Sequence, residues 1–403
     1  METKPLAIII GRNYSTRLCL IQSIGEAGCD VVVIQTSKYQ KKIETIDASS
    51  RFVVGVKMCK EPNREGLIEI INSYKDSSRR TLLIPADDYA ASVIDQNLDC
   101  LQDYFICPHV NKTQGSVIQL MDKEFQKSLA KRVGLNVAKS WIAYYVDGEY
   151  IIPSDVTYPC FTKPLECYSN GPLKRFLKKC DSEKDLRNLL KRISRLYQVP
   201  ILIEQYHKID KEYAVLGLSL CSQSIIPSVI QMLSNKDGLT ATGTIFPISR
   251  IPNLQQKLTN LMSETQLVGL FDIDLYESEG ELFFNELNVR YGASGFALNK
   301  VVGNLPRVYI DYQLGRNVDL KQIRYVFEEK SFASEKVLAD LYLKKKISYS
   351  QYKKTLANSE VLSLDDQYDV NPYIVYHKKE RMIVVKRNYL GLKKEVKKRF
   401  LTK

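Results

Sequence analysis

Two polar runs in the third quarter of the chain carry the residues best suited to chemistry. They combine carboxylates, an amide and a guanidinium: Asp272 and Asp274 in the first run, and Glu286, Asn288 and Arg290 in the second. Alternate residues of a strand share a face. A glycine between the runs allows a hairpin, so each strand would turn a carboxylate toward one common site. Such hard oxygen ligands suit Mg²⁺ bound together with substrate phosphates, and the arginine adds a fork for a phosphate or carboxylate.

A lysine at the end of an apolar strand indicates an anion-binding position. Lys163 closes the run 160–163, where burying a charge without an anion would be costly. The loop that follows contains Ser169, Asn170 and Gly171, which could surround phosphates through backbone N–H groups and a hydroxyl. A plain β-turn is the alternative interpretation of this loop.

A second apolar strand, 200–204, leads into a segment suited to a nucleobase. Glu204, Gln205 and Tyr206 offer backbone groups that can pair with an adenine edge. Eight residues after the first of these, Glu212 could accept a hydrogen bond from a ribose hydroxyl. Taken alone, this segment is a weak signal, because its residue types are common.

The elements that position these residues begin with a βαβ unit. Residues 6–10 form a continuous apolar run typical of a buried parallel strand. A helix with apolar residues at three-residue spacing follows, and 31–34 is the next strand. The fold class is therefore α/β. The turn Gly11-x-Asn13 after the first strand lacks the further glycines of a dinucleotide-binding fingerprint.

Two aspartates, Asp87 and Asp88, follow another buried strand at 82–85. Ligands of open α/β sheets bind at the C-terminal ends of the strands, which makes either aspartate a candidate substrate contact. The competing interpretation is a helix N-cap. A domain boundary is expected near 108–112, before a helix at 121–133.

The pattern changes after residue 320. The expected elements are a helix at 334–346, a helix at 350–358 and a hairpin that joins 373–376 to 382–385. The final helix has lysines and an arginine around one apolar face, which consists of Tyr389, Leu392, Val396 and Phe400. Such a helix can lie on an anionic membrane surface. Packing on its own domain is the alternative.

Composition limits the classes of function. The 58 Lys and Arg exceed the 46 Asp and Glu by 12, which indicates an anionic partner such as a nucleotide, a membrane surface or a nucleic acid, or else a solvated basic face. The nine scattered cysteines form no CxxC pair, so neither a zinc ribbon nor a thioredoxin-like site is indicated. Free thiols predict a reducing, cytoplasmic location. The apolar run near the N-terminus is too short for a signal peptide or a membrane span.

Taken in their order along the chain, these segments resemble the ATP-grasp superfamily over residues 110–310. The resemblance implies nucleotide contacts at Lys123 on the helix, at Lys163, at the phosphate lid Ser169, Asn170 and Gly171, at the adenine hinge Glu204, Gln205 and Tyr206, and at the ribose contact Glu212. It implies that Asp274, Glu286 and Asn288 bind the metal and that Arg290 and Lys163 act in phosphoryl transfer. Asp272 competes with Asp274 for the first metal position.

The resemblance also implies an architecture and a reaction. The expected domains are a Rossmann-like domain at 1–110, a two-lobed ATP-grasp domain of α+β type at 111–315 with its lid lobe near 135–205, and a basic α+β extension at 316–403. The implied cofactors are ATP and Mg²⁺, with Mn²⁺ as a substitute. The implied reaction activates a carboxylate as an acyl phosphate and joins it to an amine.

Within the superfamily, the chain looks like bacterial carboxylate–amine ligases of the D-aspartate ligase type. The expected partners are small carboxylates and amines, including an amino acid and a cell-envelope or polysaccharide precursor. No nucleic acid is expected, and a homodimer and peripheral membrane contact are both compatible with the sequence. The alternatives are a carboxylase that forms carboxyphosphate and a non-catalytic ATP-binding module in envelope polysaccharide assembly.

Overall fold

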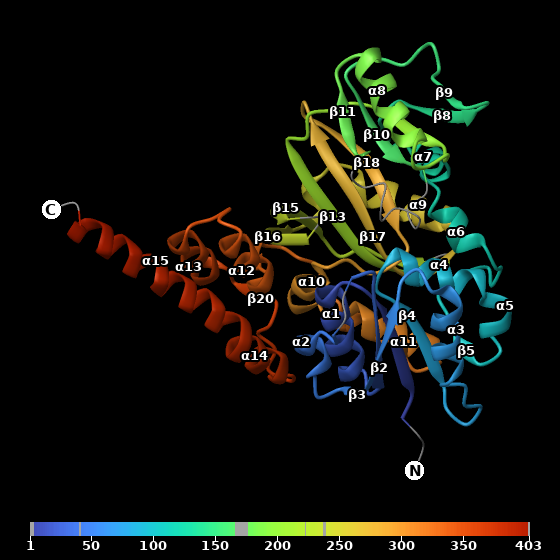
Figure 1. Ribbon diagram of the computed structural model, residues 1–403. Helices are drawn as coiled ribbons and strands as arrows, with labels where there is room; N and C mark the ends of the chain where they lie inside the picture. Colours follow the sequence, from blue (N-terminus) through green and yellow to red (C-terminus); the bar gives the residue numbers. More distant parts are fainter. Residues whose placement is uncertain (1–3, 40–41, 166–175, 222, 237–238, 402–403) are drawn as a thin grey trace.

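Three β-sheets organise the chain (Figure 1). The computed structural model describes residues 4–39, 42–165, 176–221, 223–236 and 239–401. The first sheet lies at the N-terminal end of the molecule and the second at the opposite end, with the largest sheet between them.

The first sheet is parallel and has the order β3-β2-β1-β4-β5. Its strands are β1 (Leu6–Gly11), β2 (Asp30–Ser37), β3 (Val53–Lys60), β4 (Thr81–Pro85) and β5 (Phe105–Ile106). Its helices are α1 (Tyr14–Glu26), α2 (Thr45–Ala48), α3 (Arg64–Asn72), α4 (Asp88–Gln96) and α5 (Leu98–Leu101). Because α1 packs on one face and α3 and α4 on the other, the central strands are apolar on both sides. The predicted βαβ unit and α/β class are confirmed.

The second sheet is antiparallel and has the order β11-β10-β12-β8-β9. Its strands are β8 (Ser140–Val146), β9 (Glu149–Ile151), β10 (Cys160–Pro164), β11 (Lys178–Cys180) and β12 (Ile201–Gln205). The amphipathic helix α8 (Glu183–Ser194) packs its leucines on this sheet. Ser182 caps the helix by accepting a hydrogen bond from the Asp185 amide at 3.3 Å.

The central sheet has the order β20-β19-β16-β15-β13-β17-β18-β7, with β14 and β6 at its side. Its strands are β6 (His109–Val110), β7 (Asn136–Val137), β13 (Lys211–Leu220), β14 (Gln223–Ile225), β15 (Val229–Lys236), β16 (Leu239–Phe246), β17 (Leu267–Ser278), β18 (Glu281–Asn288), β19 (Lys330–Ala333) and β20 (Val361–Leu362). One face is covered by α6 (Ser116–Leu120), α7 (Lys123–Arg132) and α9 (Leu254–Thr265).

The opposite face of the central sheet shares a hydrophobic core with the first sheet. Ile9 of β1 and Leu216 of β13 belong to one buried cluster, which also contains α10 (Gly295–Val302) and α11 (Leu305–Gln313). Because α1 contacts both of these helices, the first sheet is held in a fixed place against the central sheet. This packing brings Asp88, which follows β4, to within 3.3 Å of Arg290, which follows β18.

The C-terminal part joins the central sheet through β19, which pairs antiparallel with β16. Helices α12 (Glu335–Leu343) and α13 (Tyr349–Asn358) match the predicted pair. The predicted hairpin is wrong: the structure has α14 (Asn371–Tyr376), a π-helical turn (His377–Arg381) and the long α15 (Met382–Leu401). The β-branched residues after Met382 suggested a strand, but Val384 is buried in a cluster with α12 and α13, and packing overrides local propensity.

Within the described residues, no helix combines the length and the apolar composition that crossing a bilayer requires. The eight described cysteines are all free thiols, as expected.

Candidate active site

The predicted hairpin forms, and it turns two carboxylates toward each other. Asp274 of β17 stands opposite Glu286 of β18, and Asp272 stands opposite Asn288. A register shift after Asp274 leaves Asn285 as an extra residue on β18. The resulting bulge re-aims the end of the strand, and Asn285 reaches the cavity described below.

The two aspartates of β17 have different partners. Arg290 Nη1 donates to Asp272 Oδ2 at 3.0 Å, whereas Asn288 Nδ2 donates to Asp274 Oδ2 at 3.3 Å. Asp272 is thus engaged by the guanidinium, and Asp274 faces Glu286. This geometry favours Asp274 over Asp272 as the first metal ligand.

The electrostatics of the hairpin fit a divalent cation. Burial raises the pKa of Asp272 to about 6 although Arg290 opposes the shift. Burial, together with the charges of Asp272 and Glu286, raises the pKa of Asp274 well above its ordinary value. One buried oxygen, Asp272 Oδ1, has no hydrogen-bond partner. A cation among these crowded carboxylates would relieve their repulsion.

The donor set also fits Mg²⁺. Among the described residues, no group of three or more His, Cys, Asp or Glu is placed to hold a metal. The hairpin offers two carboxylates and an amide, and Mg²⁺ typically takes one or two carboxylates together with substrate phosphates. Asp274, Glu286 and Asn288 are therefore suited to a metal that arrives with a nucleotide.

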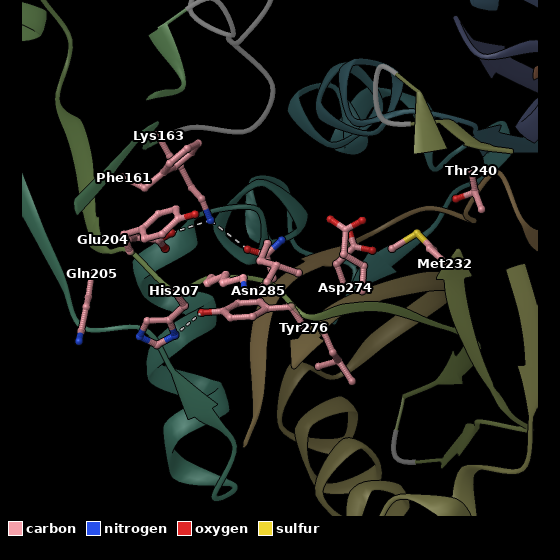
Figure 2. Close-up of a pocket in the computed structure, with 15 residues that line it drawn as sticks. Phe161, Lys163, Glu204, Gln205, His207, Met232, Thr240, Asp274, Tyr276 and Asn285 are labelled. Carbon is pink, nitrogen blue, oxygen red and sulfur yellow. Dashed lines mark hydrogen bonds and ion pairs between the residues drawn. The ribbon is translucent and has the colours of Figure 1, made fainter. Parts of the chain in front are cut away.

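A buried ion network lies where the second sheet faces the central sheet (Figure 2). Glu204 of β12 pairs with Lys127 of α7 through one oxygen and with Lys163 of β10 through the other, the latter at 2.6 Å. Lys163 Nζ also donates to Asn285 Oδ1 at 2.9 Å. The network therefore connects α7, the second sheet and the hairpin.

The charges of this network shift one another's pKa values. Burial disfavours the Glu204 carboxylate, but Lys163 and Lys127 outweigh that effect and lower the pKa of Glu204 to about 2. Burial lowers the pKa of Lys127, although Glu204 opposes the shift. Both ammonium groups converge on Glu204, and Lys127 Nζ also lies 3.8 Å from Glu124 Oε1, so the lysines are held in place by carboxylates before any ligand binds.

Lys127 is the residue that the sequence reasoning missed. The predicted lysine, Lys123, lies at the start of α7 with its Nζ 3.6 Å from Glu286 Oε2, beside the hairpin. One helical turn later, Lys127 is 3% exposed and reaches Glu204. Residues four apart share a helix face, so this spacing was the signal that could have identified it.

The network opens on a cavity of about 480 Å³, a volume within the range of small-molecule sites. Six of the predicted residues line it: Lys163, Glu204, Gln205, Tyr206, Glu212 and Asp274. Four others do not line it and lie at or beside the hairpin: Lys123, Glu286, Asn288 and Arg290. The predicted lid residues Ser169, Asn170 and Gly171 fall outside the described part of the chain.

The backbone of the predicted adenine hinge is partly engaged. The Gln205 amide donates to the Lys139 carbonyl at 2.8 Å, and the Tyr206 amide donates to the Pro159 carbonyl at 3.0 Å. These two N–H groups are therefore not free donors for a base. Carbonyl oxygens, each with two lone pairs, remain the means by which this segment could meet an adenine edge.

Aromatic rings form one wall of the cavity, which the sequence did not reveal. Tyr276 Oη lies 3.1 Å from His207 Nδ1 (Figure 2), and both residues line the cavity. Phe283 stacks on Tyr276 with ring centroids 5.2 Å apart. Tyr276 and Phe283 fit an ordinary apolar strand pattern, so no local signal distinguished them.

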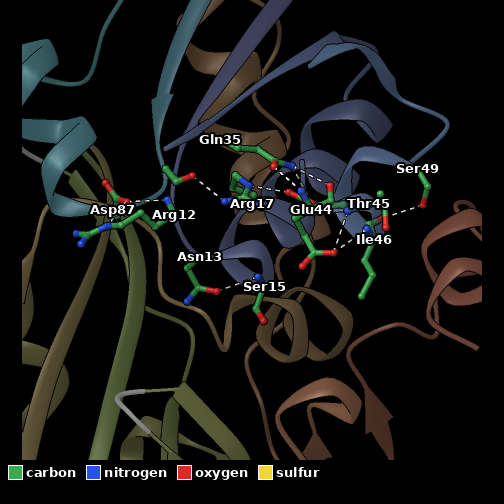
Figure 3. Close-up of polar contacts among 12 residues, drawn as sticks. Arg12, Asn13, Ser15, Arg17, Gln35, Glu44, Thr45, Ile46, Ser49 and Asp87 are labelled. Carbon is green, nitrogen blue, oxygen red and sulfur yellow. Dashed lines mark hydrogen bonds and ion pairs between the residues drawn. The ribbon is translucent and has the colours of Figure 1, made fainter. Parts of the chain in front are cut away.

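A second charged cluster stands at the carboxyl edge of the first sheet (Figure 3). Arg12, after β1, donates from its amide to Asp87 at 2.7 Å and from Nε at 3.3 Å. The same Nε lies 3.3 Å from buried Glu61. Asp87 also caps α4, and Asp88 lies 3.3 Å from Arg290. The helix N-cap interpretation is therefore confirmed for Asp87, and a substrate contact at either aspartate stays a prediction.

A buried ion pair fixes the turn that carries Arg12. Arg17 Nε lies 2.6 Å from Asp47, and its Nη1 donates to the Gly11 carbonyl at 2.7 Å (Figure 3). Both side chains are almost fully buried, and Gln35 also donates to Asp47. Arg17 therefore ties the end of β1 to α2 and holds the neighbouring cluster in position.

Comparison with solved structures supports this description. An L-amino acid ligase from Bacillus licheniformis is 14% identical, with 82% of this chain and 79% of that chain covered at a TM-score of 0.61. An N5-carboxyaminoimidazole synthetase from Staphylococcus aureus, complexed with ADP, is 14% identical, with 87% of each chain covered and a TM-score of 0.61. The biotin carboxylase domain of the Hydrogenobacter thermophilus 2-oxoglutarate carboxylase, in complex with MgADP and bicarbonate, is 16% identical, with 81% and 73% covered and a TM-score of 0.59.

These likenesses confirm that the chain has the ATP-grasp fold. No family model and no curated protein matches the sequence.

Proposed function

We propose that the protein is a Mg-ATP-dependent carboxylate–amine ligase that forms an amide through an acyl phosphate. The observation that carries the proposal is the cavity in which the Lys127–Glu204–Lys163 network meets the carboxylate hairpin. A nucleotide with its base against the aromatic wall would direct its phosphates toward the two lysines and the hairpin. The fold shared with the L-amino acid ligase supports this reading.

The reaction follows from the positions of the chain's own residues. Asp274, Glu286 and Asn288 would hold Mg²⁺, which neutralises phosphate charge when bound. Lys163 and Lys127 would orient the phosphates. A substrate carboxylate oxygen attacks the γ-phosphorus, and ADP leaves. The amine nitrogen then attacks the acyl carbon, expels phosphate and loses a proton, so no protein nucleophile is required.

The substrate position is the edge of the first sheet that faces the hairpin. Arg290 is held between Asp272 of the hairpin and Asp88 of this edge, so it lies where the two parts meet. Arg12 could bind a carboxylate, whereas Asp87 and Glu61 could bind an ammonium group. An amino acid carries both groups, which makes it the substrate class that this edge fits best.

The test measures ADP release from the full chain with Mg-ATP and a panel of D- and L-amino acids, with and without amine acceptors. Hydroxylamine is added in parallel to trap an acyl phosphate as a hydroxamate. The likeness to D-aspartate ligases stays a prediction, and it makes D-aspartate the first acid to try. We expect one acid to stimulate ADP release and hydroxamate formation, and Glu286→Ala to abolish both.

The matched control is Glu281→Ala, because Glu281 is an exposed glutamate at the start of the same strand. Stimulation by bicarbonate alone would instead favour a carboxyphosphate-forming enzyme, the class suggested by the carboxylase among the similar structures. ATP binding without ADP release across the panel would favour a binding module.

A further inference from the structure

We propose that the C-terminal helix α15 docks the protein on an anionic membrane surface, lying in the plane of the interface. This inference does not depend on the proposed ligase activity. In Figure 1, α15 extends away from the three sheets to the C-terminal end of the chain, beside α12 and α13. Its position leaves one side of the helix open to an external partner.

Most of the excess charge of the protein lies in this region. Residues 377–403 contain eleven Lys and Arg but two Glu, which gives +9 of the total of +12. The other 376 residues together carry +3. A short segment with this charge is attracted to an anionic surface through each basic residue near that surface.

An exposed apolar stripe follows the outer side of α15. Met382, Val385, Tyr389 and Leu392 are 63%, 49%, 63% and 53% exposed. Their spacing of three and four residues places them on one helix face, and the sequence continues the spacing with Val396 and Phe400. Such a stripe is costly in water and is stabilised at a lipid interface.

The opposite side of α15 packs on the protein. Val384 is 1% exposed and lies in a cluster with α12 and α13, and Arg387 donates to the Leu343 carbonyl. The stripe is therefore not the packing face of the helix. The alternative that the sequence left open, packing on its own domain, applies to one side of α15, while the outer side stays exposed.

A basic groove of about 1040 Å³ lies between α15 and the segment 342–348, which joins α12 to α13. Its lining combines apolar side chains with four basic ones: Lys345, Lys346, Lys386 and Arg387. This combination fits a lipid headgroup phosphate with the adjoining apolar chain. The groove and the stripe flank the same helix.

Two other partners fit the exposed side of α15 less well than a membrane does. A second copy of this chain would bring two segments of +9 together, which is unfavourable. A nucleic acid would satisfy the charge but would leave the apolar stripe in water. An anionic lipid surface satisfies both.

The test is co-sedimentation of the full chain with vesicles of phosphatidylcholine alone and with vesicles that also contain phosphatidylglycerol. We expect binding to the second kind only. The Tyr389→Ser/Leu392→Ser variant should bind at least about tenfold more weakly, because two exposed apolar side chains no longer enter the interface. Lys386→Glu/Lys393→Glu should also lose binding.

The matched control is Tyr144→Ser/Ile151→Ser, since this pair in the second sheet has similar exposures of 53% and 56%. Thermal unfolding checks that each variant is folded. Equal binding to both kinds of vesicle, or no binding, would overturn the proposal. A concentration-dependent dimer, seen by light scattering, that the Tyr389→Ser/Leu392→Ser variant abolishes would also overturn it. The same holds if the protein retains a polyanionic RNA and this variant leaves the retention unchanged.

Discussion

The cavity beside the hairpin and the C-terminal helix both have basic side chains, but the surroundings of these side chains differ. In the cavity, Lys127 and Lys163 are largely buried and share the Glu204 carboxylate. The segment 377–403, which includes α15, contains eleven basic and two acidic residues, and large apolar side chains such as Tyr389 are exposed on this helix.

Under the two proposals made above, this difference corresponds to two kinds of anion recognition. Buried ammonium groups need a carboxylate to offset desolvation, and the pairing fixes their positions before a ligand arrives. Such a site selects a small anion of defined shape. Exposed charge without local compensation acts over a broad surface and depends on salt. The following changes are expected to break or sharpen this contrast.

The largest effect is expected at the hairpin. Asp274→Asn should lower ATP turnover by at least about 10³-fold, because the metal would lose a charged ligand on the transferred phosphates. Steady-state ADP release measures the loss. Asp272→Asn is the comparison, and it should cost less because Asp272 holds Arg290. A larger loss for Asp272→Asn would reverse the assignment of the two aspartates.

The next largest effect is expected on the free energy of unfolding, at the buried Arg17–Asp47 ion pair. Arg17→Met should lower the free energy of unfolding by about 3–5 kcal/mol, because Asp47 would stay buried without its cation. Urea denaturation measures the change. Arg12→Met removes an arginine that is 44% exposed, and such pairs contribute about 0–1 kcal/mol. If both variants lost the same free energy of unfolding, burial would not explain the expected difference between the two ion pairs.

The network should also give a pH signature. The pKa of Glu204 is lowered to about 2, below its unfolded value, so its stabilisation is complete above that unfolded value and is lost as pH falls toward 2. The stability advantage of the wild type over Glu204→Gln, on the order of 3 kcal/mol, should therefore shrink below about pH 4.5.

Denaturation of both proteins from pH 7 downward measures this difference. Glu149→Gln serves as a control at an exposed glutamate of β9. A difference that stays constant into strong acid would contradict the ion network as its source.

The smallest effect is expected on α15. Tyr389→Ser/Leu392→Ser should change the free energy of unfolding by less than about 0.5 kcal/mol, since exposed positions away from special contacts rarely contribute more. Turnover with a soluble acid and amine should stay within about twofold of the wild type. The reason is that α15 extends away from the sheets whose residues line the cavity (Figure 1). A large loss of turnover would mean that the helix and the cavity are coupled.

The sequence by itself determined the features that depend on local order. Alternation placed Asp274, Glu286 and Asn288 on one face of a hairpin, and apolar runs identified the strands that end at Lys163 and Glu204. The regular periods of strands and helices encode these features within a few positions.

Only the tertiary structure decided which side chains pair with one another. It brought Lys127 rather than Lys123 to Glu204, and it placed Asp88 beside Arg290. It also paired the Gln205 and Tyr206 amides with backbone carbonyls, so these amides are not free to bind a base. It also formed a helix at 382–385, where β-branched residues suggested the second strand of a hairpin with 373–376. These outcomes depend on which elements pack together across hundreds of residues, and that packing is set by burial of the whole core rather than by local propensity.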